Sequence, residues 1–405
     1  MENKQSRRKF LLTGTVAMAG VGVAGLHSVG YSRPPHKGEK INIGLIGCGS
    51  RGIGLATVMK NLDNLSLRAC CDINPDQLNK GLGLADKSAK GYADYRKLLE
   101  DKNIDAVVIA TPLYLHFPMG MDAVDAGKHI YMEKTITHTI PEALTLSQKL
   151  KNSSLVFQVG HQYRYYGLYH KVKEILDGGW CGQVTQFECQ YHRNNDWKKP
   201  VADPKLEKEV NWRMYKAYSG GLMTELCAHQ IDIVNWFTGN VPTRVTGMGS
   251  LDYWKDGREI FDHTRALYHY PNGVTSSVSS ILSNAYKGYA IRILGTEGTV
   301  EIQRDKAFVY AEPTKVELGV VDGVSGATVK NNTHGEAIPI HFDSPDGRNQ
   351  EPTLYALADF AKCILERKKP FCDIQQGKDV AIAVHMANKA MEEEKYQYWD
   401  KAYST

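Results

Sequence analysis

The residue types best suited to chemistry are a glutamate and a histidine four residues apart, Glu225 and His229, in a helix-like run over 222–236. That spacing places both side chains on one face of a helix. A histidine can accept the proton of a hydroxyl group, and a neighbouring carboxylate can orient the ring and stabilise its charged form. Lys134 could stabilise negative charge developing on the same oxygen, so the set suits removal of a proton from an alcohol undergoing oxidation. Taken alone, such a Glu/His pair is more often a solvated helix face, and such a lysine a surface residue.

A glycine-rich turn is the second chemical feature. Gly47, Gly49 and Gly52 form a G-x-G-x-x-G pattern between an apolar run at 41–46 and a helix-like stretch at 53–61. In a dinucleotide-binding turn these glycines permit the tight turn, the approach of a pyrophosphate and close helix–strand packing, and the helix amides bind the phosphates. Ser50 and Arg51 lie inside this turn and are predicted to contact the cofactor. The alternative is a glycine-rich turn of an unrelated α/β protein.

Asp72 follows 20 residues after Gly52, at the end of the next apolar run. Its carboxylate can accept hydrogen bonds from the ribose hydroxyls of a dinucleotide and would repel a 2′-phosphate. The sequence therefore favours NAD over NADP.

Strand-like runs alternate with helical spacing in the first part of the chain, which predicts an α/β Rossmann domain with a doubly wound parallel sheet over residues 40–160. The expected strands are 41–46, 65–71, 106–110, 129–132 and 156–159. Ligands of such sheets lie outside the carboxyl ends of the strands. Cofactor contacts are therefore expected at Thr111, Pro112, His116, Glu133 and Lys134.

The pattern changes after residue 160. Strand-like runs cover 184–192, 243–251, 264–270, 274–282, 290–294 and 300–303, and a Pro-Asn-Gly turn joins two of them at 271–273. We expect an α+β domain with a large open antiparallel sheet over 161–350. Helical segments at 353–367 and 376–394 lie in a last region, 351–400, that is predicted to pack back on the first domain.

Four residues between these landmarks could contact a sugar. Trp212 and Arg213 precede the helix-like run that carries His229, and Tyr163 and Arg164 follow the last strand of the first domain. Aromatic faces and guanidinium groups suit a ring that bears several hydroxyls. Packing of these side chains within their own domain is the alternative.

Taken in order, the motifs resemble those of the glucose–fructose oxidoreductase/inositol dehydrogenase family (Gfo/Idh/MocA). They are Gly47-x-Gly49-x-x-Gly52, Asp72, Thr111-Pro112, Glu133-Lys134, Gly160-His161-Gln162-Tyr163-Arg164 and Gly220-Gly221-x-x-x-Glu225-x-x-x-His229-x-x-Asp232. The resemblance extends over nearly all of residues 40–400. It implies NAD or NADP as cofactor, Lys134 and His229 as the catalytic pair, Asp232 near the substrate, and a sheet that mediates dimers or tetramers.

Two positions depart from the family pattern. The Glu-Lys pair is usually followed by proline, and here Thr135 follows it. The family's aspartate four residues before the histidine is Glu225 in this chain, and its extra methylene moves the carboxylate outward by about 1.5 Å. The change could alter substrate stereochemistry, or Glu225 could no longer orient His229.

The N-terminal segment 1–31 carries Arg7 and Arg8 ahead of a weakly apolar run rich in glycine and alanine at 13–29. Twin arginines before such a run are typical of a twin-arginine export signal. This predicts use of the twin-arginine export machinery and a periplasmic or other extracytoplasmic location. Because that route carries folded proteins, we expect the cofactor to travel tightly bound. An N-terminal anchor is the alternative.

Composition narrows the partners. The net charge is +4, and no basic cluster outside residues 1–31 suggests a nucleic-acid surface. The eight cysteines show no C-x-x-C pair and no Cys/His spacing typical of zinc, so no metal is expected. Cys70 and Cys71 end an apolar run and are expected to be buried thiols, although a disulfide between distant cysteines stays open.

Three functions fit these observations. The first is an exported NAD(P)-dependent oxidoreductase that transfers a hydride to or from a sugar, glycoside or cyclitol. The second is an NAD-dependent glycosidase that works by transient oxidation and elimination. The third is a non-catalytic sugar-binding relative.

Overall fold

The structure, a computed structural model, describes residues 40–201, 203–312, 318–321, 324–329, 335–343 and 349–404. The predicted export signal at 1–31 lies outside these residues. Within them, no helix combines the length and the apolar character needed to cross a membrane.

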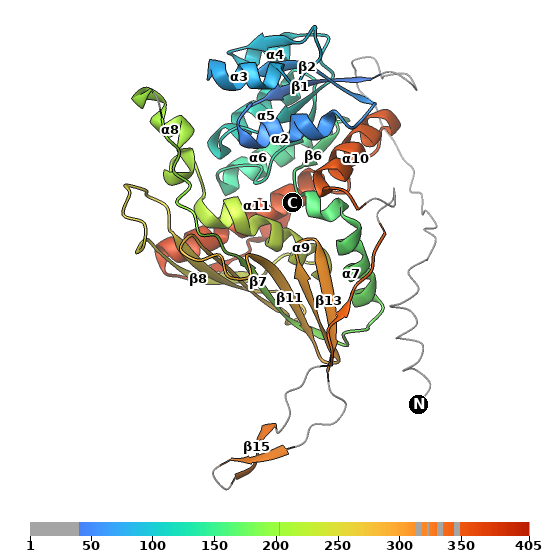
Figure 1. The fold of residues 1–405 in the computed structure, drawn as a ribbon, viewed down its shortest axis with the longest axis vertical. Coiled ribbons are helices and arrows are strands. Elements are labelled where there is room, and N and C mark those ends of the chain that lie inside the picture. The colour runs from blue at the N-terminus through green and yellow to red at the C-terminus, as the bar shows by residue number, and fades with distance from the viewer. Residues whose placement is uncertain are drawn as a thin grey trace.

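The first domain is built on a six-stranded parallel sheet in the order β3-β2-β1-β4-β5-β6 (Figure 1). Its strands are β1 (Ile41–Ile46), β2 (Leu65–Cys71), β3 (Lys90–Tyr92), β4 (Ala106–Ile109), β5 (His129–Met132) and β6 (Phe157–Val159). The central strands are mostly apolar because helices cover both faces of a parallel sheet. The sequence did not predict β3, whose three residues Lys-Gly-Tyr carry no apolar pattern and lie at the sheet edge.

Helices surround this sheet. They are α2 (Ser50–Met59), α3 (Pro75–Leu82), α4 (Tyr95–Glu100), α5 (His116–Asp125) and α6 (Ile140–Leu150), with a 3-10 turn η1 (Leu113–Leu115) before α5. From the far end of the chain, α10 (Pro352–Glu366) joins the same apolar core. Its Phe360 packs edge-on against Tyr131 of β5 with ring centroids 5.8 Å apart. Helix α10 thus packs on the first domain.

The second domain holds a nine-stranded sheet in the order β16-β13-β12-β11-β7-β10-β9-β8-β17. Its strands are β7 (Val184–Tyr191), β8 (Arg244–Ser250), β9 (His263–His269), β10 (Thr275–Ile281), β11 (Tyr289–Gly295), β12 (Gly298–Gln303), β13 (Lys306–Ala311), β16 (Ile338–Pro339) and β17 (Gln397–Tyr398). A separate pair is formed by β14 (Leu318–Val321) and β15 (Val324–Val329). The predicted fold class is confirmed, with one correction: β10 pairs with β7 in parallel, so the sheet is mixed.

Helices line the face of this sheet that looks toward the first domain (Figure 1). They are α9 (Ala228–Thr238) and α11 (Ile374–Glu393), and α11 contributes to the cores of both domains. The remaining elements are η2 (Gln162–Tyr165), α7 (Gly167–Asp177), η3 (Pro204–Leu206), α8 (Glu207–Val210), η4 (Trp212–Met214), the π-helical turn η5 (Met223–Cys227) and η6 (Lys401–Ser404). The carboxyl ends of β4, β5 and β6 therefore face η5 and α9, and the candidate site lies there.

Candidate active site

The glycine turn between β1 and α2 has the geometry of a phosphate cradle. Gly47 has φ +92°, and a Cβ on it would lie 2.7 Å from the carbonyl oxygen of Ala110. A Cβ on Gly52 would lie 1.9 Å from the carbonyl oxygen of Gly47, whereas a Cβ on Gly49 would meet no atom within 4 Å. Helix α2 starts at Ser50 with no capping side chain and no acidic residue in its first turn. The free amides and the open side at Gly49 fit a pyrophosphate group.

Asp72 lies at the end of β2, beside this turn. Its Oδ2 accepts a hydrogen bond from the amide of Cys48 at 2.7 Å, and its Oδ1 accepts one from the amide of Asn74 at 2.8 Å. Two backbone amides hold the carboxylate in one orientation, and each oxygen keeps a further lone pair for a ribose hydroxyl. The residues present thus fit the adenosine half of NAD.

The placement of Asp72 yields a testable preference. Asp72→Asn keeps an acceptor oxygen and removes the charge that repels a 2′-phosphate, so the ratio of NADP to NAD affinity should rise by about tenfold. Titration of both dinucleotides by fluorescence measures that ratio. Asp76→Asn is the matched control, because Asp76 is an exposed carboxylate in the first turn of α3. An equal change in both variants would contradict the role of Asp72.

Arg51 and Glu133, both predicted to contact the cofactor, form an ion pair with each other. The Arg51 Nε donates to Glu133 Oε1 at 2.7 Å, and its guanidinium lies 3.4 to 3.5 Å from the hydroxyl of Thr353 on α10. The Glu133 side chain also fills the space where a Cβ on Gly160 would stand. These contacts tie the glycine turn to β5, β6 and α10.

Thr111 and Pro112 follow β4 and lie beside the glycine turn, where the Thr111 methyl group is 3.0 Å from a Cβ placed on Gly47. The prediction for His116 requires correction. Its ring is buried, with Nδ1 2.8 Å from the carbonyl oxygen of Thr135 and Nε2 3.1 Å from that of Thr111. His116 therefore joins the loops after β4 and β5, and its ring nitrogens are not directed at a cofactor.

Lys134 follows β5 and reaches across to the π-helical turn η5. Its Nζ donates to the carbonyl oxygens of Glu225 at 2.6 Å and Thr224 at 3.0 Å. The Lys134–Thr135 peptide bond is cis, at the position where the family has proline. Burial lowers the pKa of Lys134, and the nearby charge of Glu225 offsets part of that shift. The ammonium is thus held at the junction of the two domains.

The carboxylate of Glu225 does not contact His229. Its Oε2 accepts a hydrogen bond from Arg213 Nε at 2.7 Å, and the Glu225 side chain is only 10% exposed. The segment from 223 to 227 is a π turn, in which bonds run from i to i+5, so the α-helical spacing assumed for the pair does not apply. The expectation that Glu225 orients His229 is not supported, and the longer carboxylate instead fixes Arg213.

His229 lies in the first turn of α9 and is 8% exposed. Its ring lies 5.0 Å from the ring of Tyr163 and 5.8 Å from that of His161. Burial, followed by the charge of Lys134, holds the pKa of His229 well below its usual range. The imidazole is therefore neutral at neutral pH and able to accept a proton.

Arg164 and Asp232 were predicted to contact substrate, and in the structure they form a buried ion pair with each other. The Arg164 Nε donates to both carboxylate oxygens of Asp232, at 2.8 and 2.9 Å, and the two side chains are 6% and 1% exposed. Trp236 and Phe371 flank the guanidinium. A charged pair satisfied in this way supports η2 and α9 and leaves little surface for a ligand. Tyr163 is also buried, and it forms part of the wall around His229.

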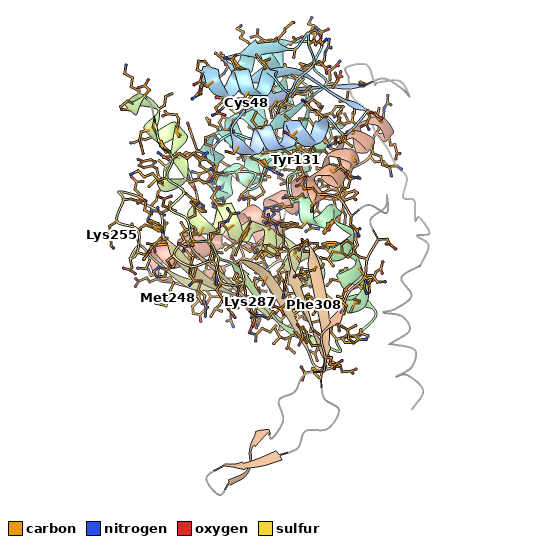
Figure 2. All side chains as sticks on the ribbon, viewed as in Figure 1. Cys48, Tyr131, Met248, Lys255, Lys287 and Phe308 are labelled. Atoms are coloured by element: carbon orange, nitrogen blue, oxygen red, sulfur yellow. The ribbon has the colours of Figure 1, made fainter. Side chains whose placement is uncertain are left out.

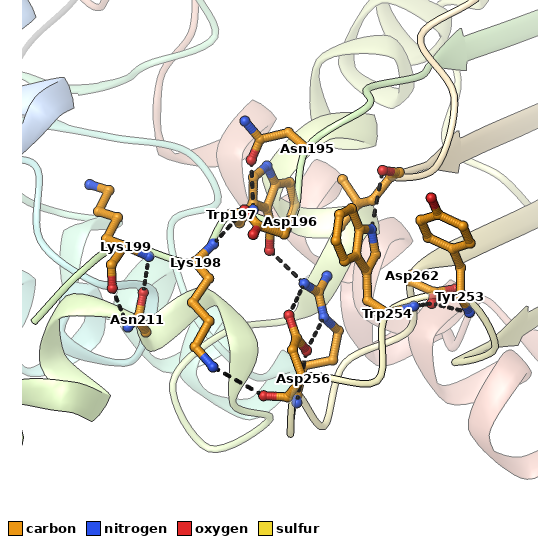
Figure 3. A network of polar contacts seen from close by, with 12 residues as sticks. Asn195, Asp196, Trp197, Lys198, Lys199, Asn211, Tyr253, Trp254, Asp256 and Asp262 are labelled. Atoms are coloured by element: carbon orange, nitrogen blue, oxygen red, sulfur yellow. Dashed lines mark hydrogen bonds and ion pairs between the residues drawn. The ribbon is translucent and has the colours of Figure 1, made fainter.

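Trp212 and Arg213 lie beside the site, with the Arg213 guanidinium stacked 4.2 Å from the Trp212 ring. The segment that carries them is held by a polar network (Figure 3). The Asn211 side chain accepts a hydrogen bond from the amide of Lys199 and donates one to its carbonyl oxygen. The Arg258 guanidinium donates to the carbonyl oxygen of Asp196. Both side chains predicted to contact sugar are therefore positioned at the rim of the site, with Glu225 behind Arg213.

Two residues near the site were missed by the sequence reasoning. Lys199 lies with its Nζ 3.4 Å from the Ser50 hydroxyl at the start of α2, and nothing in its neighbourhood in the sequence indicates this. His161 lies next to His229, and a signal did exist. It follows β6 in the same way that Glu133 and Lys134 follow β5, at the edge where ligands of such sheets bind.

Buried and half-buried histidines make the stability of the fold depend on pH. Burial lowers the pKa of His129, His161 and His385 to about 4 each, from an ordinary value of 6.5. Between these values the unfolded chain binds more protons, so the free energy of unfolding should fall as the pH drops from 6.5 toward 4, by up to roughly 3 kcal/mol per histidine. Urea unfolding across this range measures it. His129→Asn, whose Oδ1 can still accept from Val156, should flatten the dependence, and a flat curve for the parent chain would contradict it.

A Rossmann domain with a phosphate-binding turn, and a lysine and a histidine brought to its carboxyl edge by a second, mostly antiparallel domain, define a class of nicotinamide-dependent oxidoreductases. Two models of one family match the chain. The oxidoreductase family with NAD-binding Rossmann fold matches residues 41–161, and the GFO/IDH/MocA C-terminal domain matches residues 169–301. Together they span more than half of the chain, which therefore belongs to the Gfo/Idh/MocA family of NAD-binding oxidoreductases.

Several characterised proteins are similar to this chain. The scyllo-inositol 2-dehydrogenase (NAD(+)) of Bacillus subtilis is 28% identical over 56% of this chain and 62% of its own length. The levoglucosan dehydrogenase of Pseudarthrobacter phenanthrenivorans is 27% identical over 51% of this chain and 57% of its own length. These two alignments thus span less than two thirds of each relative. A solved structure of levoglucosan dehydrogenase with NADH and L-sorbose matches the fold with a TM-score of 0.73 and 20% identity, over 89% of this chain and 99% of the other.

Proposed function

We propose that the protein is an exported, NAD-dependent dehydrogenase that oxidises one hydroxyl-bearing carbon of a sugar, glycoside or cyclitol. The observation that carries the proposal is the position of Lys134 and His229. Both lie at the carboxyl edge of the Rossmann sheet, close enough for the lysine charge to lower the pKa of the histidine. The relatives named for inositol and levoglucosan support a polyhydroxylated ring as substrate.

The nicotinamide ring supplies the hydride acceptor when NAD is bound. His229 accepts the proton of the substrate hydroxyl, for which its lowered pKa keeps the ring in the neutral form. The ammonium of Lys134 stabilises the negative charge that builds up on the same oxygen, and the carbonyls of Thr224 and Glu225 hold that ammonium in place. These two side chains divide the proton and charge chemistry between them.

Arg213 and Trp212 supply the surface that holds the sugar. The Glu225 carboxylate fixes one edge of the Arg213 guanidinium, and stacking on Trp212 fixes its plane. The remaining N–H groups of Arg213 are suited to ring hydroxyls. Glu225 thus acts on the substrate through Arg213, and its extra methylene relative to the family's aspartate serves that contact.

Export and a resident cofactor are part of the proposal. Arg7 and Arg8 before the apolar run support the twin-arginine route, which moves folded proteins, and a cofactor can enter before export. Lys199, next to Ser50 at the start of α2, supports tight retention because it adds a positive charge beside the phosphate-binding turn. NAD is favoured over NADP by the charge of Asp72.

Self-association also belongs to the proposal. Adjacent strands of the second sheet expose large apolar side chains, with Met248 on β8 82% exposed, Leu267 on β9 52% and Tyr398 on β17 63%. Met248 lies on the outer side of the sheet, away from the first domain (Figure 2). Exposed apolar patches of this kind mark protein interfaces. A homodimer or homotetramer through this face is expected.

The deciding experiment uses protein purified from the exported fraction without added cofactor. Its absorbance is recorded before and after addition of inositols, free sugars and glycosides in turn. Appearance of the reduced-nicotinamide band with one substrate class supports the proposal. Release of a free aglycone without net reduction indicates the oxidation–elimination glycosidase instead. Protein that contains no nicotinamide and binds none when supplied contradicts it.

A further inference from the structure

Three buried nitrogen atoms in the candidate site have no hydrogen-bond partner among the described residues. They are both ring nitrogens of His161 and the Nδ1 of His229. His161 is 1% exposed, and its ring stands perpendicular to that of His229 with the centroids 5.8 Å apart. Burying a polar atom without a partner costs about 1–3 kcal/mol, so three such atoms in one place indicate a function or an ordered water that pairs them.

After burial, the strongest influences on a proton at the His229 ring are positive charges. Lys134 after β5, Arg51 on α2 and Arg304 after β12 all disfavour the charged imidazole, as does a charged His161. The Glu225 carboxylate is paired with Arg213. A proton taken up by His229 therefore requires a second acceptor.

The surroundings of His161 are different. Burial lowers the pKa of His161 as it does that of His229, but the charges around the two rings differ. Asp232 on α9 and Glu133 favour a proton on His161, while Arg164 on η2 and Lys134 oppose it. Tyr163, which packs against His229, carries no charge at neutral pH because burial raises the pKa of its hydroxyl. Of the two imidazoles, only His161 has carboxylates among the groups that act on it most strongly.

We propose that His161 is a positioning residue that receives the proton His229 takes from the substrate. This inference rests on the proposed function. As the alcohol carbon loses a hydride with its electron pair to the nicotinamide, the hydroxyl proton passes to Nε2 of His229, and the carbonyl forms. A proton leaves Nδ1 of His229 for His161, directly or through one buried water, so the two rings together hold the one proton that the reaction releases.

The test replaces His161 with asparagine and with glutamine. The expected result is a fall in kcat of about tenfold to a hundredfold, with the KM for the sugar and the affinity for NAD unchanged. The acid limb of the pH profile should also move to lower pH. Without His161, the proton can bind only to His229, whose positively charged neighbours lower its affinity for the proton. His129→Asn is the control, since His129 is a half-buried histidine at the amino end of β5 and its replacement should leave kcat and the profile unchanged. Variants that bind NAD and keep the parent kcat and profile overturn the proposal.

A second measurement uses the unchanged protein, in case neither variant folds. A crystal structure with NAD bound, at a resolution that shows ordered waters, should place a water or a direct nitrogen–nitrogen hydrogen bond between the two imidazoles. Rings separated with neither contact overturn the relay. The outcome is distinct from failure of the proposed function, which would show as the absence of turnover in the parent protein with every sugar.

Discussion

Replacing Lys134 with methionine should lower kcat/KM about a hundredfold to a thousandfold, which is the size expected when a preorganised charge is removed from a developing alkoxide. Methionine keeps the length and apolar stem of lysine and loses only the ammonium. Steady-state rates with the best substrate from the absorbance screen measure the effect. The affinity for NAD should change little, because Lys134 binds the π turn of the second domain.

Lys128 provides a matched control in the same domain. It is also buried, and its Nζ donates to two backbone carbonyls, those of Ile104 at 2.7 Å and Asp101 at 2.9 Å. It precedes β5, however, and so lies at the amino end of the strand whose carboxyl end bears Lys134. Lys128→Met should lower the free energy of unfolding by about 1–3 kcal/mol and leave kcat/KM intact. Equal losses of activity in the two variants would show that a buried lysine matters here only for folding.

The same lysine sets an upper pH limit on activity. Burial lowers the pKa of Lys134 below its ordinary 10.5, and the reaction needs the charged form. Activity of the parent protein should therefore be lost as the pH rises through that lowered value. Lys134→Met should remove this alkaline limb and keep the acid limb that belongs to the histidines.

The second large effect is expected from Gly52→Ala, which should raise the Kd for NAD about a hundredfold. The added Cβ would stand 1.9 Å from the carbonyl oxygen of Gly47, where ordinary contacts begin near 3.4 Å. Since that atom is backbone of the turn itself, the cradle has to shift by about 1 Å or more. Such a shift breaks hydrogen bonds to the charged pyrophosphate worth about 1.5–3 kcal/mol each, which is about one to two orders of magnitude in Kd. Calorimetric titration with NAD measures the change.

Two neighbouring glycines separate steric and functional causes. Gly54→Ala adds a methyl group that meets nothing within 4 Å, on the same helix, and should stabilise the fold by about 0.5–1 kcal/mol with NAD affinity unchanged. Gly49→Ala also meets no protein atom, but its methyl group would point to the side where the pyrophosphate approaches. It should weaken NAD without lowering the free energy of unfolding. Full NAD affinity in both Gly49→Ala and Gly52→Ala would show that the dinucleotide does not bind at this turn.

The fold class and the dinucleotide site were predictable from sequence because their causes are local. Runs of buried apolar residues define the central strands. In the glycine pattern, Gly47 has a positive φ, and Gly52 packs too close to the Gly47 carbonyl for a Cβ. Asp72 and Lys134 could be placed at the carboxyl edge since each directly follows a recognisable strand. The edge strands β3, β16 and β17 were not predicted, because strands of two or three residues carry no periodic signal.

The partners of the charged side chains were decided by the tertiary structure alone. Glu225 was expected to face His229. In the π turn, its carboxylate instead pairs with Arg213, which lies twelve residues earlier in the chain. Arg164 forms a buried ion pair with Asp232, which lies 68 residues later in the chain. His161 was visible in the sequence only as part of a motif, and its place beside His229 depends on how β6 meets α9. Spacing along the chain determines which backbone forms, whereas the choice of ion pair depends on which surfaces meet when the two domains pack.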